Sequence, residues 1–223
     1  MAILALVTTA RRYADPCGIA RALDVVGDRW ALLIVRELIF GPQRFSQLRA
    51  GLPGVSANVL AQRLRELAAA GLVRSGLLDP PASVAVYELT ERGLALEPVL
   101  LELARWGSQQ PVTTANELSV SALMFALRTV ADPAGSSHVS YALRVDGQWF
   151  TLEGAGSSVT IRRGRTGQPA AALAADTATL RSVAFGREPV SAAERDGRLA
   201  ISGDRGAAER FPRLFAVPAT PAR

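Results

Sequence analysis

Lysine is absent from this 223-residue sequence, and cysteine, histidine and long apolar runs are scarce. The single cysteine excludes a disulfide framework or a cysteine-based zinc cluster within one chain. No apolar run reaches the roughly 18 residues of a membrane-spanning helix. The apolar start is followed, not preceded, by Arg11 and Arg12, which is the wrong order for a secretory signal. We therefore expect a cytoplasmic protein with no membrane partner.

The sequence also lacks the groups that an enzyme or a metal site would use. Its one histidine, His138, stands beside serines in a predicted loop, without a nucleophile and base arranged around it. No carboxylates or histidines have the spacing of metal ligands, and there is no glycine-rich phosphate loop. We expect no enzymatic activity, no cofactor and no metal ion.

Basic charge is present throughout, and all of it is arginine. The 25 arginines outnumber 20 acidic residues, for a net charge of +5, and five of them fall between Gly41 and Arg74, where Glu66 is the one acid. A GC-rich coding sequence would explain the missing lysines, but not the missing acids. Arginine suits phosphates and guanine edges, so this segment is a candidate for contact with nucleic acid.

The N-terminal half is dominated by helical periodicity. Residues 19–26, 29–39 and 45–52 are predicted helices, with Asp28 as the cap of the second. A fourth helix is predicted to begin after Ser56, a good N-cap, and to stop at Gly71.

The fourth predicted helix has one apolar and one polar face. Leu60, Leu64 and Leu67 share the apolar face, and the opposite face carries three side chains that can hydrogen-bond to base edges in the major groove, Asn58, Gln62 and Arg65. The alternative is an ordinary amphipathic surface helix.

Two predicted strands follow, at residues 72–78 and 84–89, joined by a turn at 79–83. A short helix, a turn, a polar-faced helix and a β-hairpin come in the order of a winged helix-turn-helix domain, in which the second helix enters the major groove. Thr90 is predicted to start one long helix after the hairpin.

The C-terminal half has a different pattern. Residues 110–116 are polar, contain a proline, and are predicted to link residues 1–109 to residues 117–223. An amphipathic helix at 117–130 precedes predicted strands at 139–145, 149–152, 159–163 and 199–201 and helices at 177–185 and 207–214, with Asp146-Gly147 as a hairpin turn. Helices beside a mostly antiparallel sheet make the predicted fold class α+β.

Residues 12–109 resemble the HxlR-type bacterial transcription regulators. The resemblance rests on Ala-Leu-Asp-Val-Val-Gly-Asp-Arg-Trp-Ala-Leu-Leu, Gly-Pro-Gln-Arg-Phe-Ser-Gln-Leu, Leu-Pro-Gly-Val-Ser-Ala-Asn-Val-Leu-Ala-Gln-Arg-Leu, and Tyr-Glu-Leu-Thr-Glu-Arg-Gly. It implies a homodimer built from terminal helices and a near-palindromic operator in double-stranded DNA.

Roles for individual side chains follow as hypotheses. Asn58, Gln62 and Arg65 would contact bases, and Arg44, Ser56 and Arg63 would contact phosphates. Arg74 would brace the wing or merely shield apolar surface.

Cys17 lies just before the first predicted helix, where a thiol can be activated. Several HxlR-type regulators sense oxidants with a cysteine at this place, so the resemblance makes Cys17 a candidate redox residue. The alternative is a small buried core residue, as free cysteines commonly are.

The C-terminal half resembles the sterol-carrier-protein-like fold through residues 174–186, Asp196-Gly-Arg-Leu-Ala-Ile-Ser-Gly-Asp204 and Phe211-Pro-Arg-Leu-Phe215. That fold commonly encloses an apolar tunnel, which implies a small hydrophobic effector. The side chains that would line such a ligand pocket are Leu123, Phe125, Leu127, Trp149, Leu180 and Phe185. For any one of them, a place in a plain core is the better interpretation.

These observations predict a dimeric DNA-binding transcription regulator with a fused sterol-carrier-like domain. Repression is favoured over activation, and a ligand in the second domain is expected to alter DNA binding. The alternative is a lipid- or small-molecule carrier whose winged helix makes protein contacts only. A third interpretation makes the C-terminal half a dimerisation block without a ligand.

Overall fold

A computed structural model describes residues 13–77, 84–114, 116–131, 139–155 and 158–215. The predicted turn at 79–83 and His138 lie outside the described residues. The elements follow in the order α1 (Gly18–Val26), α2 (Ala31–Leu38), α3 (Phe45–Gly51), α4 (Ala57–Ala69), β1 (Val73–Leu77), β2 (Ala85–Leu89), α5 (Glu91–Leu94), α6 (Glu97–Gly107), α7 (Val120–Thr129), β3 (Val139–Val145), β4 (Gln148–Ala155), β5 (Ser158–Arg163), β6 (Ala171–Ala175), α8 (Thr177–Ala184), α9 (Val190–Arg195), β7 (Ala200–Gly203), α10 (Arg205–Arg210) and the 3₁₀ helix η2 (Phe211–Leu214).

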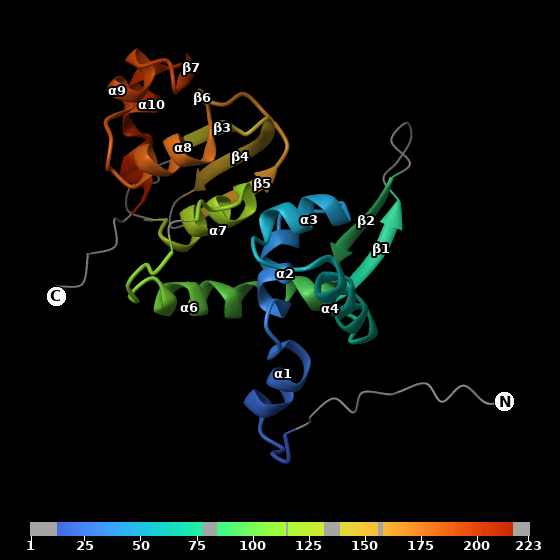
Figure 1. Ribbon diagram of the computed structural model, residues 1–223. Helices are drawn as coiled ribbons and strands as arrows, with labels where there is room; N and C mark the ends of the chain where they lie inside the picture. The colour runs from blue at the N-terminus through green and yellow to red at the C-terminus, as the bar shows by residue number, and fades with distance from the viewer. Residues whose placement is uncertain (1–12, 78–83, 115, 132–138, 156–157, 216–223) are drawn as a thin grey trace.

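The N-terminal part contains the predicted helices and hairpin. Helices α2, α3 and α4 precede the antiparallel pair β1–β2, in which Val73 lies opposite Leu89 and Leu77 opposite Ala85. Gln43 pairs with the other edge of β2 as an isolated antiparallel bridge, because its backbone N–H and C=O both bond to Tyr87. Helix α1 projects from this part (Figure 1).

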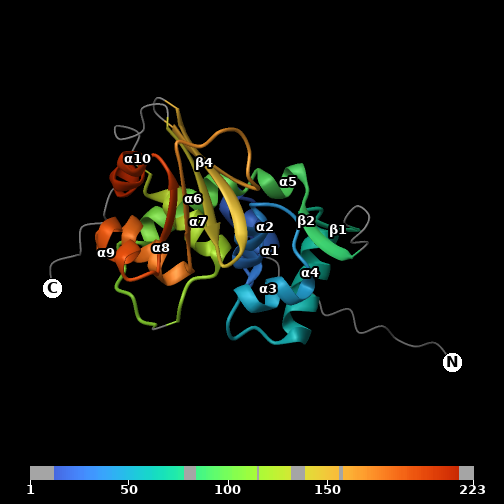
Figure 2. The same cartoon turned by 90° about the horizontal axis from the view of Figure 1, so that it is seen from above.

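The C-terminal part is a five-stranded sheet with helices, in the strand order β5-β4-β3-β6-β7. Only β3 and β6 are parallel among these neighbours, so the predicted, mostly antiparallel arrangement is confirmed. Asp146 and Gly147 both have positive φ, 47° and 79°, as a tight hairpin turn between β3 and β4 requires. Figure 2 shows this sheet and helices α8–α10 on one side of the molecule, and the β1–β2 hairpin on the other.

Helix α7 joins the two parts. It packs against α2, α3 and α6 on one side and against β5 and α8 on the other, and it lies between them in Figure 1. The buried apolar residues of both parts form one continuous core. Phe40, just after α2, meets Phe150 on β4 edge to face, with ring centroids 5.9 Å apart. The predicted linker therefore connects two parts that pack against each other.

Three local predictions are wrong. The single helix expected after Thr90 is broken into α5 and α6, because Pro98 has no N–H and its ring would clash with the Leu94 carbonyl in a continuous helix. The last predicted helix ends earlier and continues as η2, and α9 was not expected at all. Asp28 does not cap α2 with its side chain; Trp30 precedes that helix instead, at a left-handed φ of 81°.

Candidate nucleic-acid interface

Helix α4 is built as its sequence predicts. Ser56 Oγ accepts the N–H of Val59 at 3.3 Å, which begins the helix, and Leu60, Leu64 and Leu67 are buried beneath it. Burial of one face leaves the opposite face available for a ligand.

The three predicted base-contacting side chains are not equally free. Asn58 and Arg65 are exposed, whereas Gln62 is half-buried. The Gln62 carboxamide donates to Glu66 Oε1 at 2.6 Å and accepts from Arg65 Nη2 at 2.5 Å. These two bonds fix the orientation of the Gln62 carboxamide and leave it one N–H donor and one acceptor lone pair for a further partner.

The three predicted phosphate contacts also differ. Arg44 is exposed at the start of α3, where its backbone N–H donates to Gln47 Oε1 at 2.8 Å. Ser56 accepts a bond in its capping role, which leaves its O–H free to donate to a phosphate. Arg63 forms ion pairs with Asp28 and, at 2.5 Å, with Glu66. These pairs give Arg63 a structural role in addition to the predicted one.

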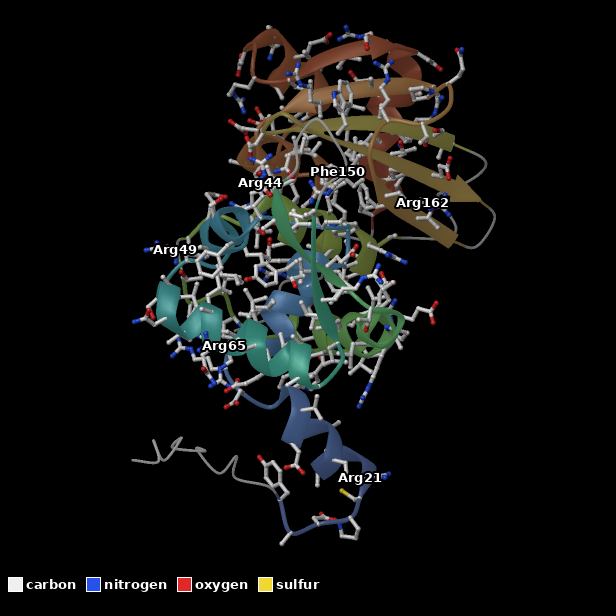
Figure 3. All side chains as sticks on the ribbon, turned by 90° about the vertical axis from the view of Figure 1, so that its right-hand side faces the viewer. Arg21, Arg44, Arg49, Arg65, Phe150 and Arg162 are labelled. Atoms are coloured by element: carbon white, nitrogen blue, oxygen red, sulfur yellow. The ribbon has the colours of Figure 1, made fainter. Side chains whose placement is uncertain are left out.

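Arg49 on α3 joins this surface. It is exposed in the last turn of α3 and lies on the same side of the molecule as Arg44 and Arg65 (Figure 3). Its place in the basic segment was visible in the sequence, but sequence reasoning assigned it no role. Arg44, Arg49 and Arg65 are hereafter the α3–α4 arginines.

The wing is braced by a cross-strand ion pair. Arg74 and Glu88 lie opposite each other on β1 and β2, with Arg74 Nε 2.8 Å from Glu88 Oε1. This contact favours the bracing role for Arg74 over simple shielding.

Cys17 is exposed, so the interpretation of it as a buried core residue is wrong. It is the N-cap of α1, and its Sγ accepts the N–H of Ala20 at 3.3 Å. Its candidate redox role stays a prediction.

The residues predicted to line an apolar ligand pocket are placed within the C-terminal part. Leu123, Phe125, Leu127 and Leu180 are at most 4% exposed and belong to the packed core. Phe185 is half-buried against that core, and Trp149 is half-buried beneath the guanidinium groups of Arg144 and Arg165. The hydrophobic ligand pocket stays a prediction.

A polar cluster, which sequence reasoning missed, lies where the two parts meet. The buried Glu37 carboxylate accepts from Arg36 at 2.5 Å and from Ser119 at 2.6 Å, and the Gln43 carboxamide donates to Ser121 Oγ at 3.1 Å. Gly51 on α3 lies close to Glu37: a Cβ atom at position 51 would be 2.5 Å from Glu37 Oε2, so the absence of a side chain there makes room for the carboxylate. Glutamate and glutamine side chains are seldom buried, so residue type alone would place Glu37 and Gln43 at the surface, and the sequence did not reveal the cluster.

Arg163 on β5 also reaches across this boundary. Its Nε donates to the Phe40 carbonyl at 3.1 Å, and its Nη1 donates to Gln148 Oε1 at 2.5 Å. Burial lowers the pKa of Arg163, against an opposing effect of the negative charge on Glu37.

Comparisons with known proteins agree with this geometry. The model of the HxlR-like helix-turn-helix family matches residues 25–114. The "Uncharacterized HTH-type transcriptional regulator YvaP" of Bacillus subtilis is 39% identical over 89 residues, which cover 40% of this chain and 82% of that protein. The "HTH-type transcriptional regulator YodB" of the same organism is 36% identical over 88 residues, covering 40% and 79%.

The solved reduced form of YodB covers 42% of this chain and 92% of its own, at 35% identity and a TM-score of 0.38. The family match ends at residue 114 and does not include the five-stranded sheet. Among the described residues, no helix is long and apolar enough to cross a membrane.

Proposed function

Because the chain belongs to the HxlR-like helix-turn-helix family of transcription regulators, we propose that it binds a near-palindromic promoter operator as a homodimer and represses transcription there. Residues 1–109 bind DNA and dimerise, and residues 117–223 modulate that binding. The observation that carries the proposal is the surface of α3 and α4, where the α3–α4 arginines and Asn58 are exposed together beside a helix with a buried apolar face.

In this proposal α4 enters the major groove and the wing lies on the backbone or in the minor groove. Arg65 and Asn58 then meet base edges, and Arg44, Arg49 and the Ser56 hydroxyl meet phosphates. In a two-fold dimer the half-sites lie about 10 base pairs apart, or a multiple of that.

Apolar side chains on the terminal helices support the homodimer. Ile19 on α1 is 75% exposed and Trp106 on α6 is 63% exposed, and Leu23, Val99 and Leu103 are exposed on the same two helices. Large apolar side chains exposed on these helices favour a protein interface.

The proposed modulation by an effector rests on the C-terminal part. Its sheet and helices are compatible with the sterol-carrier-like fold, and its contacts with α2 and α3 give an effector a route to the DNA-binding elements. A hydrophobic effector at Leu123 or Leu127 would have to open the packed core, because both side chains are fully buried.

The test is a fluorescence-anisotropy titration with DNA from the upstream region of the chain's own gene and with random DNA. We expect tight, sequence-preferring binding that weakens with salt, with a log–log slope of roughly −0.9 for each neutralised phosphate. Binding of an apolar ligand at high salt, without preference among DNA sequences, would favour the carrier instead.

A further inference from the structure

Arg163 carries a charge at the boundary between the two parts; Glu37 compensates it only from beyond contact distance, and the Phe150 ring faces its guanidinium group with the centroid 5.1 Å away. Arg163 has a largely buried guanidinium group, whose buried Nη2 has no hydrogen-bond partner among the described residues. Among the described residues, no carboxylate oxygen lies within 4.0 Å of its nitrogens; its two bonds go to a neutral carbonyl and a neutral carboxamide. A buried charge is costly unless an opposite charge compensates it.

A pocket of about 300 Å³ adjoins this guanidinium group. One wall is the end of α2, with Ile39 and Phe40; the other walls are β5 and α7, which supply Arg162, Arg163 and Arg128. All charged side chains that line this pocket are arginines. Its chemistry is therefore that of an anion site with an apolar side.

The three arginines are not equally available. Arg128 forms an ion pair with Glu97 on α6, whereas Arg162 is exposed and reaches Glu153 only at 3.4 Å. Successive side chains of a strand leave it on opposite faces, but β5 is an edge strand of its sheet, and both Arg162 and Arg163 line the pocket. Arg163 supplies a largely buried charge, and Arg162 supplies an exposed one. Guanidinium groups bind carboxylate and phosphate through paired, charge-assisted hydrogen bonds.

The pocket lies away from the proposed DNA surface. In Figure 3, Arg162 lies on the side of the molecule opposite the α3–α4 arginines. A DNA backbone along α4 would not explain these charges, which favours a small anion over a nucleic acid.

The pocket is also connected to the DNA-binding elements. The Arg163 Nε–H donates to the carbonyl of Phe40. Gln43, three positions after Phe40, bonds to β2 through its backbone and lies two residues before the first residue of α3. An anion that draws Arg163 toward itself would act on this segment, and through it on α3 and the wing.

We propose that the pocket between the end of α2 and β5 is an effector site for a small anion, a molecule with a carboxylate or phosphate group next to an apolar portion, held by Arg162 and Arg163. Its effect on DNA binding rests on the proposed function; the anion binding itself does not.

The first experiment measures binding to the full chain by isothermal titration calorimetry and thermal unfolding. Benzoate and phenyl phosphate are the probes, because each pairs an anion with a ring that fits against Ile39 and Phe40. Benzyl alcohol and benzylamine are the neutral and cationic counterparts. We expect one or both anions to bind and to raise the unfolding midpoint by about 3–6 °C at roughly ten times their Kd. Their relative affinity distinguishes carboxylate from phosphate.

Two variants locate the site. Arg162→Gln, on an exposed side chain, should weaken binding of the preferred anion about tenfold, and Arg163→Met should abolish it. Arg195→Gln removes an exposed positive charge from α9 and should leave binding unchanged. Failure of both anions to bind, equal binding of benzyl alcohol, or equal losses in Arg162→Gln and Arg195→Gln would overturn the proposal.

The second experiment adds the preferred anion to the anisotropy titration, with chloride at matched ionic strength as the control. We expect the Kd for operator DNA to change at least about threefold in the wild type and not in Arg163→Met. Anion binding without this change would keep the site and overturn its regulatory role. If the protein bound no DNA, calorimetry would still show whether the anion binds. Failure of the anion site and failure of the proposed DNA-binding function are therefore distinguishable.

Discussion

The carboxamide of Gln43, two residues before α3, donates to the hydroxyl of Ser121 at the start of α7, 3.1 Å away and 78 residues later in the chain. The same carboxamide donates to the Glu37 carbonyl at 2.5 Å, and the Gln43 backbone pairs with Tyr87 on the wing. One residue thus links the C-terminal part and α2 through its side chain and the wing through its backbone.

Gln43→Ala should lower the free energy of unfolding by about 1–3 kcal/mol, because it leaves buried polar groups without a partner. Chemical denaturation measures the change. Gln109→Ala, at an exposed position outside the helices, is the matched control and should change stability by less than about 0.5 kcal/mol. Similar effects of the two substitutions would mean that the Gln43 bonds contribute nothing.

Arg65→Ala should cost about 1–3 kcal/mol of operator binding and relax specificity at one base pair. The measurement is anisotropy with operator DNA and with single-base variants of it. Arg195→Ala, which removes the same charge far from α4, should have little effect. An equal loss on operator and random DNA would make Arg65 a phosphate contact.

Arg63 and Asp28 should be coupled by about 0.2–1 kcal/mol in a double-mutant cycle of unfolding free energies, a modest value because the Asp28 side chain is 67% exposed. The same variants separate the two roles of Arg63. If Arg63 also binds a phosphate, Arg63→Ala lowers the salt dependence of DNA binding by about one unit of log–log slope. Asp28→Ala removes one of the two ion pairs of Arg63, keeps the guanidinium group, and preserves that slope. Strict additivity would remove the structural role.

Trp106→Glu should shift the protein from dimer to monomer, because it places a charge within the proposed apolar interface. Light scattering after size-exclusion chromatography measures the mass. Leu77→Glu changes a side chain that is 73% exposed on the wing and should leave the dimer intact. A dimer that survives Trp106→Glu together with Ile19→Glu would place the interface elsewhere.

Asp176 should make stability fall at acid pH. Its carboxylate caps α8, and the hydrogen bond from the backbone N–H of Thr179, at 2.7 Å, holds its pKa below the ordinary value of 3.8. A depressed pKa contributes stability that is complete above the ordinary value and is lost as pH falls through the lowered one. Asp176→Asn should keep the cap and flatten this part of the stability profile below about pH 4, measured by denaturation at several pH values. An unchanged profile would contradict this role.

Local pattern was enough to predict much of the N-terminal part and the candidate site. The leucines at 60, 64 and 67, the Ser56 cap and the Asp146-Gly147 turn depend on residues a few positions away, so their signals are complete in a short stretch of sequence. The break before α6 was missed although Pro98 was visible, because apolar periodicity continues across it.

The sequence by itself thus determined helices α1–α4, α7 and α8, the hairpins, the polar face of α4 and the family of the N-terminal part. Only the tertiary structure decided that Glu66 and Arg65 engage Gln62, that Cys17 is exposed, and that Gln43 meets Ser121. It also decided that Arg163 donates to Phe40 across 123 residues and lines a pocket, with an Nη2 that has no hydrogen-bond partner in the described part of the chain. The physical reason is that the spacing of residues along the sequence shows which face of a helix or strand a side chain occupies. The partner of that side chain depends on how elements far apart in the chain pack together.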